Sequence, residues 1–237
     1  MKEFYSRTEM MLGEEGVDRL KNAHVAIFGV GGVGGYAVEA LARAGVGRIT
    51  LVDSDCVAES NINRQIIATR DTVGMYKTEA MKARILSINP TAEVVCHSTF
   101  FDESTKGDFD FTSYDYVIDA IDSLSAKVEL IASATEAGTK IISAMGAGNK
   151  LDPTLFEVSD ISKTTVCPLA RAVRIALRKR GINHLKVVYS KEPPVLTPEV
   201  SDGVKRRVPG SISFVPSVMG LILAGEVIKD ISGANNR

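Results

Sequence analysis

The chain has 237 residues, of which 45% are hydrophobic, and its 28 Lys and Arg nearly balance its 29 Asp and Glu. A chain of this length can bury a substantial core, and the balanced charge and ordinary apolar content exclude a disordered or collagen-like protein. Its three cysteines, Cys56, Cys96 and Cys167, form no Cys-x-x-Cys couple, so we expect no disulfide framework, no structural zinc site and a reducing, cytoplasmic compartment.

Strands and helices alternate in the first 145 residues. Runs of aliphatic and β-branched residues predict strands, and apolar residues at helical spacing predict helices. In chain order we expect strand His24–Phe28, helix Gly34–Ala44, strand Arg48–Val52, helix Tyr76–Ser87, strands Glu93–His97 and Tyr116–Ile118, helix Ser125–Ala137 and strand Lys140–Ala144. This order predicts an α/β fold, a Rossmann-like and mostly parallel sheet with right-handed crossovers and helices on both faces.

The C-terminal third continues the same domain without a clear break. We expect strands at Phe156–Val158 and Leu185–Tyr189 with a basic helix, Cys167–Lys179, between them. Five prolines make Ser190–Pro216 a predicted long loop. The last helix, Ser217–Ile231, is apolar almost all round, so it is expected to be buried against the sheet or a second subunit. No run is long and apolar enough for a membrane helix, and the N-terminus does not resemble a signal peptide.

Positive charge is concentrated in one segment. Residues Ile161–Lys191 contain eight Lys and Arg and no Asp or Glu, so the rest of the chain has 20 cations against 29 anions. On a helix, Arg171, Arg174 and Arg178 fall within a stripe of about 60°, opposite the apolar side chains. Such a stripe fits a polyanion such as nucleic acid, but it also fits a solvated basic face, and the residues alone leave both interpretations open.

A glycine-rich turn predicts a nucleotide site. Gly29-Val30-Gly31-Gly32-Val33-Gly34 follows the first predicted strand and opens the first helix. Residues without Cβ atoms let the chain approach phosphate closely, and the helix N-terminus favours an anion. Asp53, 19 residues past Gly34 at the end of the second strand, is placed to bind ribose hydroxyls. This pattern alone does not distinguish NAD, FAD and ATP.

Charged residues downstream narrow the choice of nucleotide. Arg64, Lys77 and Asp122 follow the second and later strands, and the carboxyl ends of parallel strands converge at one edge of a sheet. Two cations and an extra carboxylate suit a triphosphate with Mg²⁺. Taken singly, Arg64 and Lys77 are also explained as surface charges, and Asp122 as the N-cap of the following helix.

Together, these motifs resemble the ThiF/MoeB/HesA superfamily of ubiquitin-activating-type adenylating enzymes, over residues 4 to 160. The resemblance implies attack by a carboxylate or similar oxygen on the α-phosphorus of ATP. It also implies a homodimer, in which Arg7 reaches the ATP of the partner subunit. By position it gives Arg7, Arg64, Lys77 and Asp122 catalytic roles, places Mg²⁺ on Asp122, and predicts ATP binding by Gly29, Gly31, Gly32, Gly34, Asp53, Asp55, Asn61, Asn63, Arg64, Lys77, Asp122 and Ser123.

The C-terminal residues resemble one branch of this superfamily. The chain lacks the paired Cys-x-x-Cys zinc motifs common in MoeB- and ThiF-like enzymes, whereas Gly146–Asn149, Pro168–Arg171 and Pro209–Pro216 resemble the TcdA branch of tRNA threonylcarbamoyladenosine dehydratases. This resemblance implies ATP-dependent dehydration of threonylcarbamoyladenosine in tRNA through an acyl-adenylate. It also implies a sulfur-transfer protein as a further partner and a monovalent cation, Na⁺ or K⁺, near residues 146–159. Contacts with tRNA are expected from Lys163, Arg171, Arg174 and Arg178.

We therefore expect one ThiF-type adenylating domain over residues 1–237, with a nucleotide-binding core at about 20–145 and a substrate-binding part at 146–237. One alternative is an adenylyltransferase that activates the C-terminus of a sulfur-carrier or ubiquitin-like protein. Another is an NAD-binding oxidoreductase, which leaves Arg64, Lys77 and Asp122 without a role. Cys167 is isolated beside Pro168, which favours a structural thiol over a nucleophile.

Overall fold

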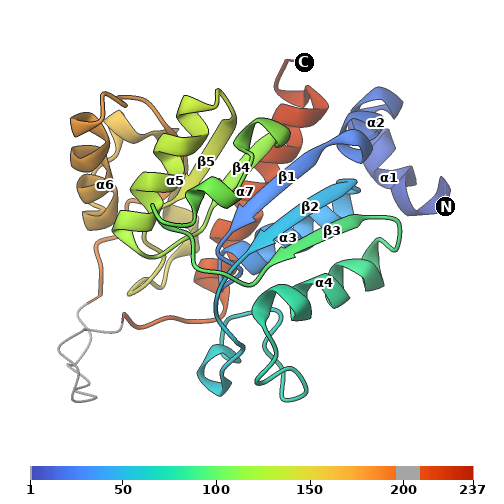
Figure 1. Cartoon of the computed structure of the whole chain (residues 1–237), viewed down its shortest axis with the longest axis horizontal. Coiled ribbons are helices and arrows are strands. Elements are labelled where there is room, and N and C mark those ends of the chain that lie inside the picture. Colours follow the sequence, from blue (N-terminus) through green and yellow to red (C-terminus); the bar gives the residue numbers. More distant parts are fainter. Residues whose placement is uncertain (1, 196–208, 237) are drawn as a thin grey trace.

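One mixed sheet forms the centre of the structure, a computed structural model that describes residues 2–195 and 209–236. The strands lie in the order β3-β2-β1-β4-β5-β7-β6, and every neighbouring pair is parallel except β6 and β7 (Figure 1). The predicted α/β fold with a mostly parallel sheet is therefore confirmed. The strands are β1 (His24–Phe28), β2 (Arg48–Val52), β3 (Glu93–His97), β4 (Tyr116–Asp119), β5 (Lys140–Ala144), β6 (Phe156–Asp160) and β7 (Lys186–Ser190).

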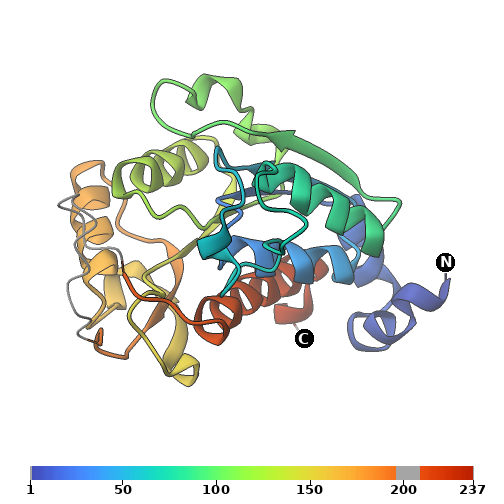
Figure 2. The ribbon, with the colours of Figure 1, turned by 90° about the horizontal axis from the view of Figure 1, so that it is seen from below.

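Helices cover both faces of the sheet, as Figures 1 and 2 show. One face is packed against α3, α4 and α7, and the other against α5, with α6 beside α5. The central strand β1 is buried on both sides, since Val25 and Ile27 point into one core and Ala26 and Phe28 into the other. The helices are α1 (Lys2–Leu12), α2 (Glu14–Asn22), α3 (Gly34–Ala44), α4 (Lys77–Ile88), α5 (Leu124–Glu136), α6 (Pro168–Lys179) and α7 (Phe214–Ser232).

The strand order reverses between β1 and β4. From β1 the chain moves outward through β2 to β3, and it then returns to add β4 and β5 on the other side of β1. The segments that leave the carboxyl ends of β1 and β4 therefore diverge. Ligands of open α/β sheets bind in the crevice that such a divergence creates.

The last helix is longer than its sequence pattern predicts. It begins at Phe214 rather than Ser217, and Pro216 therefore lies inside its first turn. Proline fits there because amide groups of the first turn have no intrahelical acceptor. Met219, Leu223 and Val227 are fully buried against the sheet, which confirms the expected burial of this helix. Of the predicted long loop at 190–216, residues 196–208 lie outside the described residues.

Two helices before β1 have no counterpart in the predicted elements. α2 buries only Val17 and Leu20 among its apolar residues, so its periodicity is too short to stand out in the sequence. Tyr5 of α1 packs on Gly45, where an added Cβ would lie 2.2 Å from the ring carbon Cε1, and the Lys21 ammonium lies 5.0 Å from the centre of the same ring. These contacts join residues that are far apart in the sequence, so local periodicity does not predict them.

None of the helices in the described ranges has the length and apolarity needed to cross a membrane.

Candidate nucleotide-binding site

The glycine-rich turn between β1 and α3 contains glycines with two different tasks. Gly29 has φ +92°, and an added Cβ would lie 2.6 Å from the carbonyl oxygen of Ala120. A Cβ on Gly34 would lie 1.8 Å from the carbonyl oxygen of Gly29. These two glycines are therefore required by the close approach of β1, β4 and α3. Gly29, Gly31 and Gly32 also line a pocket, and an added Cβ on Gly31 would meet no atom closer than 3.8 Å, so Gly31 leaves room for a ligand at this turn.

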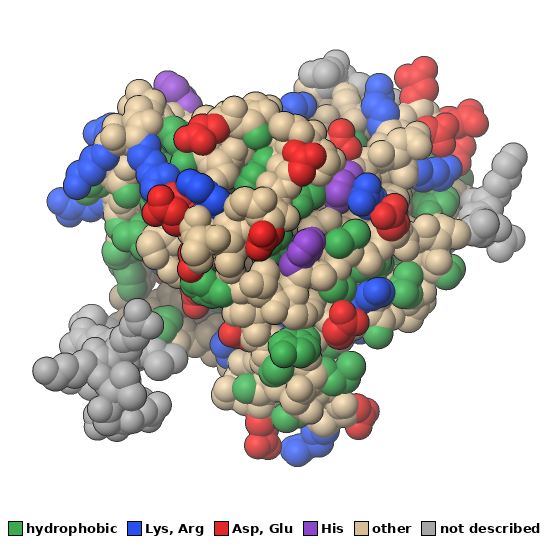
Figure 3. Space-filling view, in the orientation of Figure 1, with side chains coloured by type: hydrophobic (Ala, Val, Ile, Leu, Met, Phe, Trp, Pro, Cys, Tyr) green, Lys and Arg blue, Asp and Glu red, His purple; other side chains and the backbone are tan. Residues whose placement is uncertain are grey.

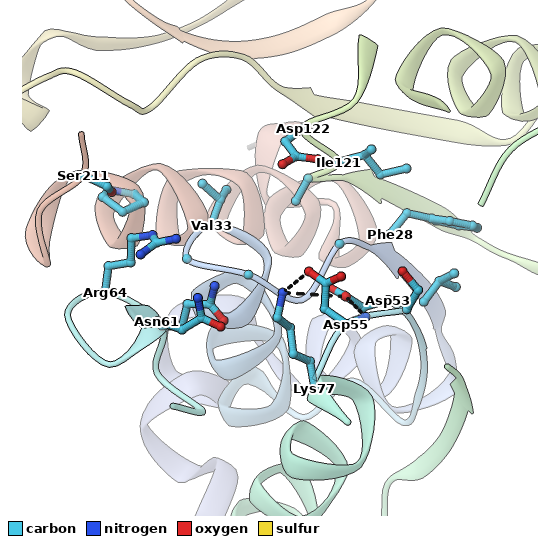
Figure 4. Close-up of a pocket in the computed structure, with 18 of the residues that line it drawn as sticks. Phe28, Val33, Asp53, Asp55, Asn61, Arg64, Lys77, Ile121, Asp122 and Ser211 are labelled. Carbon is cyan, nitrogen blue, oxygen red and sulfur yellow. Dashed lines mark hydrogen bonds and ion pairs between the residues drawn. The ribbon is translucent and has the colours of Figure 1, made fainter. Parts of the chain in front are cut away.

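The pocket lies at the carboxyl ends of β1, β2 and β4 and has a volume of about 450 Å³ (Figure 4). It contains most of the predicted nucleotide residues: Gly29, Gly31, Gly32, Asp53, Asp55, Asn61, Arg64, Lys77 and Asp122. Its walls also include Phe28, Phe100, Phe101 and Ile121, which form an apolar region. The pocket therefore offers both an apolar surface for a base and charged groups for a sugar and phosphates.

Three charged side chains, the buried Lys77, the partly buried Asp53 and the exposed Asp55, occupy one wall of the pocket. Asp53 accepts hydrogen bonds from the amides of Val30 (2.7 Å) and Asp55 (2.9 Å). Lys77 Nζ donates to Asp55 Oδ2 at 2.6 Å and lies 3.8 Å from Asp53 Oδ1. Burial raises the pKa of the Asp53 carboxyl, and the neighbouring Lys77 partly opposes that shift. Lys77 is buried at the start of α4, so this cation has a fixed position beside the glycine turn.

The segment after the short helical turn Glu59–Asn61 supplies a second polar wall. Arg64 lines the pocket, and its Nη1 donates to Ser60 O (3.0 Å) and Asn63 Oδ1 (2.8 Å). Asn61 also lines the pocket, but its Oδ1 accepts from the amide of Ala58 (3.1 Å). Asn63 differs from its predicted role, because it is not among the lining residues and its Nδ2 donates to Ser211 O at 3.1 Å.

Gln65 is a pocket residue that the sequence analysis did not select. It is buried and lines the pocket, and its Oε1 has no hydrogen-bond partner among the described residues. A polar residue next to an arginine gives no signal in the sequence that distinguishes a surface side chain from a buried one. Only its position beside Gly31 places it in the site.

Asp122 reaches the pocket from the segment between β4 and α5. The N-cap of α5 is Ser123, so the alternative interpretation of Asp122 as the helix cap is wrong. No hydrogen bond or ion pair joins the Asp122 carboxylate to a described residue, and Figure 4 shows it on the wall opposite Lys77. Ser123 does not line the pocket, and its hydroxyl lies 3.2 Å from that of Ser125. A single free carboxylate suits Mg²⁺, which binds proteins through one or two carboxylates together with phosphates and waters. The described residues contain no group of three or more His, Cys, Asp or Glu side chains that could hold a metal ion.

A completely buried ion pair lies beneath this segment. Lys127 Nζ of α5 donates to Asp119 Oδ2 at 2.7 Å, and both side chains have 0% exposure. Asp119 also accepts from the Ser143 hydroxyl and from the amide of Ile121 (3.1 Å), while Lys127 donates to Ala144 O (3.0 Å). The pair therefore joins the ends of β4 and β5 to α5, directly behind Ile121 and Asp122.

The remaining predicted residues lie away from the pocket. Arg7 is exposed on α1, and this helix packs on α2. The chain passes from α2 into the amino end of β1, whereas the pocket is at the carboxyl end of that strand. Arg174 also differs from its expected place, because its Nη1 turns inward to Ile161 O (3.2 Å), Thr164 O (2.9 Å) and Thr164 Oγ1 (2.6 Å). Cys167 is buried as the N-cap residue of α6, which agrees with a structural thiol.

An exposed basic surface nevertheless covers α6 (Figure 3). Arg171, Arg178 and Lys179 are exposed around Ile175, whose side chain is 49% exposed. We call these four residues the α6 basic face; Lys163 is exposed nearby. None of these cations forms an ion pair with a described residue. Three other cations of the basic segment are paired: Arg180 with Glu129, Lys186 with Glu226 and Asp230, and Lys191 with Glu157.

Comparison with known proteins extends these observations. Residues 5–237 match the model of the ThiF family. A tRNA threonylcarbamoyladenosine dehydratase of Bacillus subtilis is 47% identical over 241 residues, which cover 96% of this chain and 94% of that protein. Crystal structures of the E. coli tRNA N6-threonylcarbamoyladenosine dehydratase, TcdA, with AMP and with ATP have TM-scores of 0.90 and 0.89 and identities of 35% and 34%, covering 100% of this chain and 96% of theirs. An adenylyltransferase and sulfurtransferase of Saccharomyces cerevisiae is 34% identical over 155 residues, 65% of this chain and 35% of that protein.

The buried ion pair gives a prediction for stability. Lys127→Met should lower the free energy of unfolding by roughly 3–5 kcal/mol, because it leaves the Asp119 carboxylate buried without its counter-charge. Urea denaturation of the wild type and of Lys127→Met measures this loss, and Lys179→Met is the control for an exposed lysine. The double variant Lys127→Met/Asp119→Asn should recover part of it, since no buried charge remains. Equal stability of Lys127→Met and the control would contradict the prediction.

Proposed function

The chain belongs to the ThiF family, and we propose that it is a tRNA threonylcarbamoyladenosine dehydratase that uses ATP. The observation that carries this proposal is the convergence of Asp53, Arg64, Lys77 and Asp122 on one pocket beside the glycine turn. Of the nucleotides that the glycine pattern allows, ATP is the one that needs all four groups. It is also the nucleotide bound in the related TcdA structure.

The charges of the pocket suit a reaction in two steps. The carboxylate of the modified base attacks the α-phosphorus of ATP, and pyrophosphate leaves, so the product is an acyl-adenylate. A nucleophile within the same side chain then attacks the acyl carbon, and AMP leaves with the former carboxylate oxygen. The base thereby loses one water in total. The protein contributes mainly by positioning the reactants and by stabilising the developing charge.

The two ends of the pocket bind different parts of ATP. We place the adenine against the apolar wall of Phe28, Phe101 and Ile121, and the ribose at Asp53. The phosphates lie near the backbone of the glycine turn, where amide groups and the start of α3 favour anions. Lys77 supplies a point charge there and Arg64 a forked donor. Asp122 would hold Mg²⁺, which would neutralise phosphate charge when bound.

This function predicts a tRNA-dependent release of AMP. Purified protein with ATP, Mg²⁺ and tRNA that contains threonylcarbamoyladenosine should release AMP and pyrophosphate and leave a nucleoside lighter by one water, as mass spectrometry would show. Asp122→Asn should slow AMP release by about 100-fold or more and raise the Mg²⁺ concentration needed for half the maximal rate, because it removes a ligand charge. Asp18→Asn, an exposed aspartate of α2, is the matched control.

The outcome also separates the alternatives. Pyrophosphate exchange that responds to a protein with a Gly-Gly tail, and not to tRNA, would instead support an adenylyltransferase for sulfur-carrier or ubiquitin-like proteins. Saturable NAD binding without ATP turnover would support the oxidoreductase. Absence of tRNA-dependent AMP release in the wild-type protein would refute the proposed function.

We propose that the active site is shared between two subunits of a homodimer. Arg7 is remote from the pocket of its own chain, so it contributes to ATP only if a second copy brings it there. Its helix has an exposed apolar surface suited to such a contact, since Met10 is 84% exposed and Phe4 is also exposed. This arrangement supports the role in ATP binding that the family resemblance implies for Arg7.

Complementation between inactive variants tests the shared site. Arg7→Ala and Lys77→Met should each be inactive, and their co-expression should restore about a quarter of the wild-type activity, because random pairing leaves one intact site in each mixed dimer. Differently tagged chains allow the mixed dimers to be purified and assayed. No recovery of activity in purified mixed dimers would show that Arg7 does not act across the interface.

We further propose that the α6 basic face binds the tRNA. Arg171, Arg178 and Lys179 present unpaired positive charge suited to phosphates, and the exposed Ile175 among them offers an apolar contact for an unstacked base. Arg174, expected to join this surface, holds the turn at 161–164 against α6 instead. Lys163 at that turn lies beside the basic face and completes the proposed set.

Reversal of these charges should weaken tRNA binding in a salt-dependent way. The double variant Arg171→Glu/Arg178→Glu should raise the Kd for tRNA by at least about tenfold and lower the slope of log Kd against log salt by roughly two, while ATP binding is unchanged. Lys140→Glu, at the amino end of β5, is the control. Fluorescence anisotropy over a salt series gives both quantities. An unchanged Kd in the double variant would exclude this surface.

Other expectations stay predictions of the family resemblance. These are the division into a nucleotide-binding core at about 20–145 and a substrate-binding part at 146–237, a cytoplasmic location, a monovalent cation and a sulfur-transfer protein partner. The dependence of turnover on Na⁺ and K⁺ concentration tests the cation. Affinity capture of the tagged protein from cells tests the partner.

A further inference from the structure

A short segment of the C-terminal part forms one wall of the nucleotide pocket. Pro209, Gly210 and Ser211, which we call the crossing segment, line the pocket together with Gly148 from the loop after β5. In Figure 4, Ser211 lies beside Arg64. The crossing segment therefore borders the phosphate end of the pocket on the side of the C-terminal part.

One end of this segment is fixed by Asn149. The amide of Asn149 donates to Gly210 O at 2.8 Å, and the amide of Gly210 donates back to Asn149 Oδ1 at 2.6 Å. Asn149 O also accepts from the amide of Val195 at 2.7 Å. Asn149 makes these bonds with φ +57°, a left-handed conformation that asparagine tolerates better than most residues. Its neighbour Gly148 leaves room for the segment, because an added Cβ would lie 2.9 Å from Pro209 Cβ.

The other end is fixed by Asn63. Its Nδ2 donates to Ser211 O at 3.1 Å, while its Oδ1 accepts from Arg64. The Asn63 side chain thus contacts both the crossing segment and Arg64, which we propose binds the phosphates of ATP. Two asparagines on different loops hold three residues in place, and neither loop is near the other in the sequence.

We propose that Asn149 and Asn63 are positioning residues that hold the crossing segment so that the substrate carboxylate meets ATP in the reactive arrangement. This inference rests on the proposed function, which brings the tRNA to the C-terminal part. Within that part, the crossing segment borders the phosphate end of the pocket. A displaced wall leaves the ATP contacts of Asp53 and Lys77 intact but allows the two reactants to bind out of alignment. The loss is therefore expected in the rate of the bound complex rather than in ATP affinity.

Two substitutions at Asn149 separate its roles. Asn149→Gly keeps the left-handed backbone without strain but removes the acceptor for Gly210, whereas Asn149→Asp keeps that acceptor. In single-turnover assays with saturating ATP and modified tRNA, Asn149→Gly should release AMP about 10- to 100-fold more slowly than wild type. Asn149→Asp should recover most of this loss. Asn183→Gly, at an exposed asparagine after α6, is the matched control and should be unaffected.

Separate measurements show whether the effect is one of positioning. The Kd for ATP, measured by calorimetry, should change by less than about threefold in Asn149→Gly, and its thermal unfolding should match that of Asn183→Gly. Asn63→Asp gives an independent test, because it keeps the acceptor for Arg64 but cannot donate to Ser211, and it should slow the same step. This second variant decides the matter if Asn149→Gly does not fold.

Distinct outcomes overturn the inference and the proposed function. A wild-type protein without tRNA-dependent AMP release refutes the proposed function itself. With an active wild type, the inference fails if Asn149→Gly and Asn63→Asp both react within about twofold of it. It also fails if ATP affinity falls as much as the rate, or if Asn149→Asp is as slow as Asn149→Gly.

Discussion

The buried ion pair between Asp119 and Lys127 is the constraint on which the site depends. Both charges have 0% exposure, so each requires the other, and separating them would leave a charge without solvent or counter-ion. Through the amide of Ile121 and the carbonyl of Ala144, the pair fixes how the chain leaves β4 and β5. The carboxylate of Asp122 and the loop that contains Asn149 therefore start from fixed points.

The glycine turn imposes a complementary constraint on the other side of the pocket. Gly29 and Gly34 let β1, α3 and the segment after β4 approach so closely that no side chain would fit between them. The resulting crevice contains the cations Lys77 and Arg64 beside the carboxylates Asp53, Asp55 and Asp122 among its described lining residues. The proposed triphosphate, bound with Mg²⁺ at Asp122, suits such mixed charges. The fold thus favours a nucleotide with phosphates, and the charged side chains of the pocket narrow the choice to ATP.

The C-terminal part contributes to the same pocket and also carries a separate charged surface. The crossing segment reaches back to Asn63 and Arg64, so residues about 150 positions apart form one wall. The basic segment is divided between structure and surface. Arg174, Arg180 and Lys186 hold elements of the fold together, whereas Arg171, Arg178 and Lys179 are free of ion pairs with described residues. A net charge of −1 conceals this division.

The sequence by itself determined the α/β fold, the glycine turn and the placement of Asp53 after β2, Lys77 at the start of α4 and Asp122 after β4. Those features follow from local periodicity and from short motifs, because the residues that define them are neighbours in the chain. The tertiary structure alone decided that Asn63 faces Ser211, that Gln65 is buried in the pocket, that Asp119 pairs with Lys127 and that Arg174 turns inward. Each of these depends on a contact between elements, and the spacing of residues along the chain does not state which elements will meet.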